Sequence, residues 1–261
     1  MKNRIRFSIM AMAAIVGLAC QLIPSVTTSG FLGTPTQTPS PSPSPTETLL
    51  PTKTFTPTPL PVDVSLDLNE DGSSLFIDNI GGYSLNLPDK WLAFTFDLQG
   101  IEAVTQKIGS KNPQLIEIML RIDELEDNGY RLFAFDTKAG HSRNGYLPNL
   151  TVQIYTDSES RSYHPNDIAD YWMHDIKQEM PGTEVAVSHN RIGTGGVFTS
   201  LIFDNTVSME NNNKIPVRET IVIFQAYKAL TIIYLSAPRE TAYEVDKAIN
   251  NLFQTIKGMR P

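Results

Sequence analysis

Residues 221–235 read Ile-Val-Ile-Phe-Gln-Ala-Tyr-Lys-Ala-Leu-Thr-Ile-Ile-Tyr-Leu, and this stretch decides the fold. It contains two nearly continuous apolar runs, Ile221–Phe224 and Leu230–Leu235, which predict strands that are buried on both faces. The link between the runs is short, so the two strands are expected to pair antiparallel as a hairpin. Both faces of such a sheet must be covered by other elements, and the stretch therefore favours a layered fold.

Further strands are predicted on the N-terminal side of this pair. Residues 185–191 and 197–207 have extended patterns, and residues 217–225 lead into the first apolar run. The glycine-rich residues 193–196 and the three asparagines at 211–213 separate these segments as turns. Four consecutive antiparallel strands are therefore expected, ending near residue 235.

The first part of the domain also predicts strands joined by turns. Alternating apolar residues from Val62 to Leu68 are followed by the turn residues 69–72, and an extended pattern resumes at Leu75–Ile77. Gly81-Gly82 supplies a second turn. Four more strands are then expected, at residues 83–87, 91–96, 131–135 and 150–156.

Three helices are predicted between and after these strands. One begins at Asn112-Pro113 and ends at Asn128-Gly129, and a second runs from Pro165 to Met180. A closing helix covers about residues 238–257. The first helix is expected to bury one broad face formed by Leu115, Ile116, Met119, Leu120, Ile122 and Leu125.

Together these elements predict an α+β fold, with an antiparallel β-sheet and helices on both faces. Residues 62–261 are enough for one globular domain with a sizeable core, and the sequence shows no internal repeat.

A family resemblance supports the same architecture. Residues 82–91 read Gly-Tyr-Ser-Leu-Asn-Leu-Pro-Asp-Lys-Trp, which resembles the strand, proline and tryptophan entry of PsbP-like domains. Leu252–Ile256 also resembles the C-terminal helix of that family, although Lys90 stands where the family often has glycine. The resemblance implies an α/β/α sandwich of the kind found in bacterial lipoproteins of unassigned function. It implies no catalytic residue.

The N-terminus predicts export and lipid attachment. Lys2, Arg4 and Arg6 precede an apolar run, Phe7–Ala19, that is shorter than the roughly 20 residues needed to span a bilayer. Residues 1–19 therefore read as a signal peptide that is removed. The small residues before Cys20 resemble a bacterial lipoprotein signal, which predicts a lipidated Cys20 at the extracytoplasmic face of a cell membrane. The alternative is an ordinary cleaved signal.

Cys20 is the one cysteine, so no intrachain disulfide is possible.

Residues 20–61 are predicted to form a disordered tether. From Thr34 to Pro61 the chain is nearly all Thr, Pro and Ser and holds nine prolines, a composition that cannot form a core. An extended polyproline-like chain rising about 3.1 Å per residue would hold the domain up to roughly 80 Å from the membrane. A proline-rich ligand for a partner domain is the alternative.

The charge balance argues against nucleic acid as a partner. The chain has a formal net charge of −7, and removal of residues 1–19 takes away three cations and no anion, which leaves −10. Binding to nucleic acid depends on basic patches.

A candidate calcium site lies in the first predicted turn. Asp67, Asn69, Asp71 and Ser73 have the spacing of the first half of a calcium loop, and Asp78 stands at the twelfth position. A bidentate glutamate is usual at that position, and no helical pattern flanks the loop. The alternative is an Asp-Gly hairpin turn with solvated acidic side chains. No other metal or cofactor is expected.

No catalytic motif is present in the sequence. His141, His164, His174 and His189 lack metal-ligand spacing, and Gly-x-Ser-x-Gly does not occur. His164 is expected to cap a helix and His141 to lie in a loop.

The sequence therefore favours a membrane-anchored extracytoplasmic lipoprotein whose domain is a non-catalytic binding or assembly module for a protein partner or small ligand. An extracytoplasmic enzyme with a site assembled from distant residues and a calcium-binding lipoprotein are the alternatives.

Overall fold

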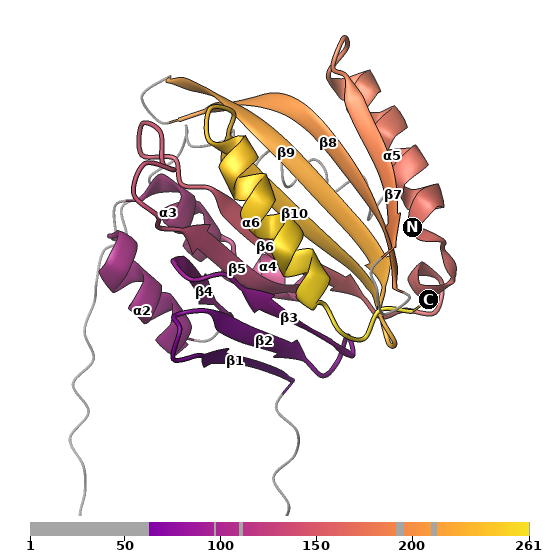
Figure 1. Ribbon diagram of the computed structural model, residues 1–261, viewed down its shortest axis with the longest axis horizontal. Helices are drawn as coiled ribbons and strands as arrows, with labels where there is room; N and C mark the ends of the chain where they lie inside the picture. The colour runs from indigo at the N-terminus through magenta and orange to yellow at the C-terminus, as the bar shows by residue number, and fades with distance from the viewer. Residues whose placement is uncertain (1–62, 97, 110–111, 192–195, 210–212, 261) are drawn as a thin grey trace, which may run out of the picture. The chain divides into compact units, whose positions relative to one another are not determined.

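The computed structural model describes residues 63–96, 98–109, 112–191, 196–209 and 213–260 (Figure 1). Within these segments the chain forms two antiparallel sheets and five α-helices. The strands are β1 (Val64–Leu68), β2 (Ser74–Asp78), β3 (Tyr83–Leu87), β4 (Trp91–Phe94), β5 (Tyr130–Asp136), β6 (Asn149–Tyr155), β7 (Val185–Arg191), β8 (Val197–Ser208), β9 (Lys214–Gln225) and β10 (Leu230–Pro238). The helices are α2 (Leu98–Ile108), α3 (Pro113–Leu120), α4 (Ile122–Asp127), α5 (Pro165–Glu179) and α6 (Ala242–Thr255), with a 3₁₀ turn at Ser160–Ser162.

The larger sheet has the strand order β4-β5-β6-β10-β9-β8-β7. The two apolar runs form the paired strands β9 and β10, whose antiparallel register runs from Gln225 opposite Leu230 to Val217 opposite Pro238. Successive residues of β10 enter different cores, since Ile232 packs on one face of the sheet and Ile233 on the other. The prediction of central strands buried on both faces is confirmed.

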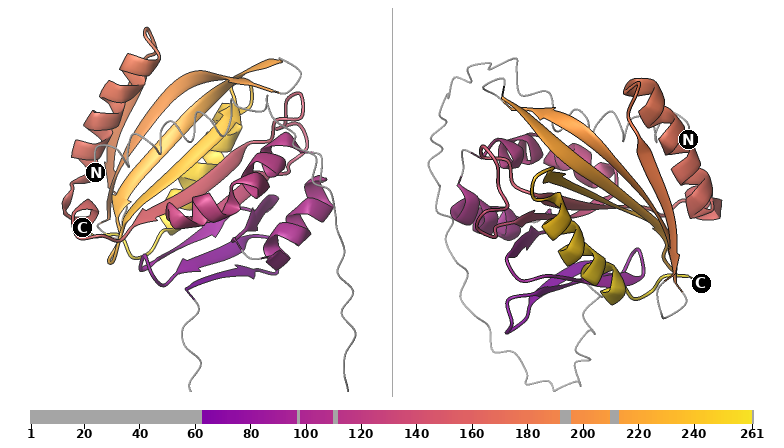
Figure 2. Two further views of the ribbon diagram at one scale, coloured as in Figure 1. Left: turned by 180° about the vertical axis from the view of Figure 1, so that it is seen from behind. Right: turned by 45° about the horizontal axis from the view of Figure 1, so that its top comes forward.

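Different layers cover the two faces of the larger sheet. On one face α6 packs together with the small sheet β1-β2-β3 (Figure 1). On the opposite face α5 covers the β7 side, while α2, α3 and α4 cover β4 and β5 (Figure 2). The predicted antiparallel sheet with helices on both faces is confirmed. The initial hairpins form a separate small sheet within one of the covering layers.

The middle of the chain differs from the prediction in two ways. Helix α2 was not predicted, and the helix expected over residues 112–128 is broken at Arg121, whose φ of −123° and ψ of 17° are not helical. The expected continuous apolar face was wrong, because Leu120 is 77% exposed next to the break. The predicted start is confirmed, since the Asn112 side chain accepts a hydrogen bond from the Leu115 backbone N–H.

None of the helices in the described segments has both the length and the apolar character needed to cross a membrane.

Lys90 has an unusual backbone conformation just before β4. Its φ is +67°, in the left-handed region that costs residues with a Cβ about 1–2 kcal/mol. The Lys90 carbonyl accepts hydrogen bonds from the backbone N–H and the hydroxyl of Thr137, which hold the turn in place. Glycine would adopt this conformation without that cost.

Replacing Lys90 by glycine is expected to raise the free energy of unfolding by about 0.5–1 kcal/mol, because glycine adopts a positive φ without a clash of Cβ. The gain is smaller than the strain removed, since glycine also loses more backbone entropy on folding. Urea denaturation measures the change. Lys90→Ala is the control, because it removes the same side chain and keeps the strain. A Lys90→Gly protein no more stable than Lys90→Ala would contradict the interpretation.

Candidate ligand-binding cleft

A cleft of about 250 Å³ lies between α6 and strands β7, β8 and β9. In Figure 1 these strands extend to the right of α6, beyond the part of the sheet that the helix covers. The lining combines amide, hydroxyl and carboxyl groups with apolar side chains. The lining residues are Asn190, Phe198, Ser200, Ile202, Thr220, Asp246, Ile249, Asn250, Phe253 and Gln254.

The strand register forms the floor of this cleft. Phe198, Ser200 and Ile202 alternate along β8 and therefore share one face of the sheet. Asn190 of β7 pairs with Phe198, and Thr220 of β9 pairs with Ile202, which brings both onto the same face. The floor is thus apolar at Phe198 and Ile202 and polar at Asn190, Ser200 and Thr220.

Helix α6 supplies the wall of the cleft. Asp246, Asn250 and Gln254 are four residues apart, so they form one stripe along the helix. Ile249 and Phe253 lie beside that stripe, and the Phe253 ring packs against Phe198 with centroids 5.5 Å apart. A polar stripe therefore borders the apolar face that fixes α6 to the sheet.

Asp246 is the charged residue of the lining. Burial raises the pKa of its carboxyl above the usual 3.8, and the nearby Arg218 guanidinium opposes that rise. Arg218 is itself paired with Asp204, its Nε lying 3.2 Å from the Asp204 Oδ1 atom. A carboxylate that is partly desolvated contributes less to the free energy of folding than a solvated one would. Carboxylates with a raised pKa of this kind are common in ligand-binding sites.

The raised pKa of Asp246 predicts how stability depends on pH. The folded state binds the proton more tightly than the unfolded state, so the contribution of Asp246 to stability falls as pH rises from about 3.8 through the raised pKa. Asp246→Asn is therefore expected to stabilise the protein at neutral pH, with a gain that disappears toward pH 3.8. Thermal denaturation from pH 3.5 to 7.5 measures this difference. A loss of stability at neutral pH would show that the ion attraction to Arg218 outweighs desolvation.

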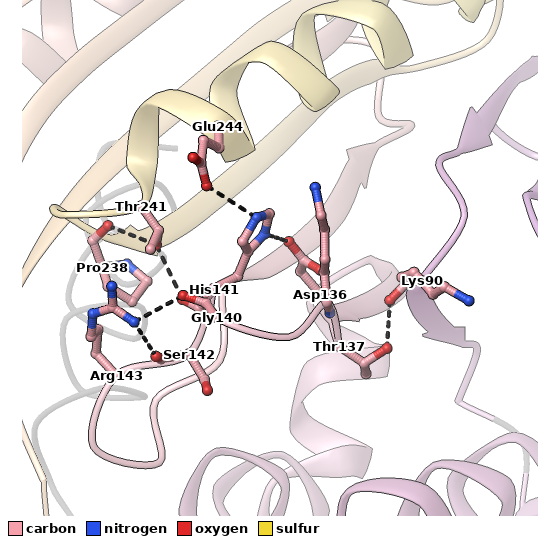
Figure 3. A network of polar contacts seen from close by, with 11 residues as sticks. Lys90, Asp136, Thr137, Gly140, His141, Ser142, Arg143, Pro238, Thr241 and Glu244 are labelled. Atoms are coloured by element: carbon pink, nitrogen blue, oxygen red, sulfur yellow. Dashed lines mark hydrogen bonds and ion pairs between the residues drawn. The ribbon is translucent and has the colours of Figure 1, made fainter.

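A second polar group lies at the start of α6 (Figure 3). His141 is 5% exposed and stands between two carboxylates, with its Nδ1 2.5 Å from the Asp136 Oδ2 and its Nε2 3.3 Å from the Glu244 Oε2. The Thr241 hydroxyl donates to the His141 carbonyl at 3.1 Å. Both ring nitrogens therefore face carboxylates, and the group joins the β5–β6 loop to the first turn of the helix that forms the cleft wall.

The remaining histidines make local contacts. His164 accepts a hydrogen bond from the Asn166 backbone N–H, which confirms its predicted role as the cap of α5. His174 lies 2.7 Å from the side-chain nitrogen of Gln178, and His189 lies 3.3 Å from the Thr199 hydroxyl. In the described part of the chain, no three His, Cys, Asp or Glu residues gather in a way that suits a metal ion.

The calcium candidates are divided between two places. Asp71 and Asn69 both contact Ser73 in the β1–β2 turn, and the Ser73 hydroxyl donates to the Asp71 Oδ1. Asp67 is exposed in β1, opposite Leu75. Asp78 lies at the other end of β2, fully buried, where it binds Arg131. The turn is a hairpin turn, and calcium binding there stays a prediction.

Sequence reasoning did not find the cleft, because its residues come from three strands and a helix far apart in the chain. The spacing of Asp246, Asn250 and Gln254 was the available signal. The role of His141 was also missed, since Glu244 lies more than a hundred residues away along the chain. Cys20, the predicted lipid attachment site, lies outside the described residues.

No family model and no curated protein matches this sequence. Among solved structures, the chain is similar to the cyanobacterial PsbP protein (CyanoP) of Synechocystis, with 13% identity, a TM-score of 0.43 and coverage of 73% of this chain and 95% of that chain. It is also similar to LpqN of Mycobacterium tuberculosis, described as involved in cell envelope biogenesis, with 13% identity, a TM-score of 0.38 and coverage of 76% and 91%. The predicted resemblance to PsbP-like domains is confirmed, because a PsbP protein is among the similar solved structures.

Proposed function

We propose that this protein is a lipoprotein held at the extracytoplasmic face of a cell membrane through Cys20, and that its domain is a non-catalytic binding module. The sequence supports the anchor, because a basic start and a short apolar run end in small residues at the cysteine. A diacylglyceryl group joined to the Cys20 sulfur by a thioether would hold the protein to the membrane, since two acyl chains bind a bilayer far more firmly than one.

The cleft beside α6 is the observation that supports the binding role. It provides both hydrogen-bonding and apolar groups on a rigid sheet and helix, which is the usual composition of a small-molecule site. Among the described residues, Asp246 is the one ionisable group of the lining, so no histidine, amine or second carboxylate stands beside it there. The partners in this proposal are the membrane and a small ligand.

The anchor is tested by expressing the full chain in a bacterial host and separating membranes from soluble fractions. We expect the protein in the membrane fraction, with mass spectrometry showing a mature N-terminus at a diacylglyceryl-modified Cys20. Cys20→Ser is the matched control and is expected to lose the lipid. An unmodified thiol at Cys20, or an intact leader on cytosolic protein, would overturn the proposed anchoring.

A further inference from the structure

We propose that the cleft between α6 and β7–β9 binds a neutral saccharide, with one pyranose ring lying on the β8 floor of Phe198, Ser200 and Ile202 and its hydroxyls bonded to the α6 stripe. This inference rests on the proposed binding function and names its ligand class. A pyranose combines apolar C–H faces with a rim of hydroxyl groups, so its chemistry can be compared directly with the cleft.

The lining has the same two-sided character. Four apolar side chains, Phe198, Ile202, Ile249 and Phe253, are interspersed with six that carry hydrogen-bonding groups. The Asn190, Asn250 and Gln254 amides each supply donors and an acceptor, while the Asp246 carboxylate supplies acceptors alone. Neighbouring hydroxyls of a sugar act as donor and acceptor together, so a set of amides with one carboxylate matches them.

The electrostatics favour an uncharged ligand. Asp246 is the charged lining residue, and its negative charge repels phosphates and carboxylates. A cationic ligand would be attracted by Asp246, but the nearby Arg218 guanidinium already acts on that carboxyl and would repel the cation. Arg218 and Arg239 are both paired with Asp204, so these three side chains together with Asp246 carry no net charge.

The size and rigidity of the cleft suit a single ring. Its volume of about 250 Å³ lies just below the roughly 300–1,000 Å³ typical of drug-sized ligand sites. The His141 group fixes the first turn of α6 to the β5–β6 loop, which holds the stripe in place relative to the sheet. Little ordering of the protein is then needed on binding.

The test is saturation-transfer NMR on the full-length protein in a zwitterionic detergent, since detergents with sugar headgroups would compete. The probes are glucose, galactose, mannose and N-acetylglucosamine, their methyl glycosides and short oligosaccharides, with glucuronic acid and glucosamine as charged comparisons and mannitol as an open-chain polyol. We expect at least one neutral pyranose to receive saturation, mannitol to receive none, and the charged sugars to bind more weakly. Equal binding of a free sugar and its methyl glycoside would indicate that the ring is recognised within a longer glycan, whereas loss on methylation would indicate a free monosaccharide.

Two neighbouring asparagines on α6 provide a matched pair of variants. Asn250 lines the cleft and Asn251 does not, and both side chains are exposed, so neither change should unfold the protein. Asn250→Ala is expected to weaken binding about tenfold, the value of one lost hydrogen bond, and Asn251→Ala to change it less than about twofold. Absence of binding by every neutral sugar, equal effects of the two variants, or tighter binding of glucuronic acid would overturn the saccharide proposal. None of these results would bear on lipidation at Cys20, which fractionation tests separately.

Discussion

Replacing Asp78 by alanine is expected to lower the free energy of unfolding by about 3–5 kcal/mol, because it leaves a largely buried guanidinium without its counter-ion. The Asp78 side chain is 0% exposed, and its Oδ2 accepts a hydrogen bond from the Arg131 Nε at 3.2 Å. Its Oδ1 accepts the Gly81 backbone N–H at 2.8 Å. Asp78 lies on β2 and Arg131 on β5, so this ion pair joins the small sheet to the large one.

Urea denaturation of the single variants and of the double variant Asp78→Val, Arg131→Met measures the effect. The double variant is expected to recover much of the loss, since it removes both charges and leaves apolar side chains of suitable volume. The experiment also bears on calcium, because a loss that is unchanged by EDTA identifies Asp78 as a structural partner of Arg131. A loss below about 1 kcal/mol for Asp78→Ala would contradict the assigned role.

Replacing Trp172 by alanine is expected to cost a similar amount, about 3–5 kcal/mol, through the loss of packing and the cavity left behind. Trp172 is 0% exposed at the centre of α5 and stacks on Tyr234 of β10, with ring centroids 5.8 Å apart. It belongs to the apolar stripe of Ile168, Trp172 and Ile176 that packs α5 on the sheet. The stripe has the four-residue spacing predicted from the sequence.

Trp172→Phe separates packing from the polar part of the indole. The indole N–H is buried without a hydrogen-bond partner among the described residues, so its removal should cost nothing in hydrogen bonding. We therefore expect Trp172→Phe to lose clearly less stability than Trp172→Ala. Tyr243→Ala is the control, since that side chain is 78% exposed and should change stability by less than about 0.5 kcal/mol. Similar losses for all three variants would contradict this account, and thermal or urea denaturation provides the comparison.

The strands were largely predictable because their signals are local. The alternating pattern and turn residues around Gly81-Gly82 predicted the first hairpins, and the apolar runs predicted β9 and β10 as buried neighbours. Helix boundaries marked by capping residues, such as His164-Pro165, were also found. The break at Arg121 was missed, because the apolar spacing continues across it without glycine or proline.

The amino-acid sequence alone determined the class of fold, the hairpin connections and the proline-rich composition of the N-terminal part, because these depend on residues close together in the chain. The tertiary structure decided which side chains meet. Asp78 reaches Arg131 and His141 reaches Glu244 only after strands and helices distant in sequence have packed, and the same packing brings Asn190 and Asp246 into the lining of one cleft. Strand register and the placement of α6 on the sheet create these contacts, and both are set by packing of the whole core.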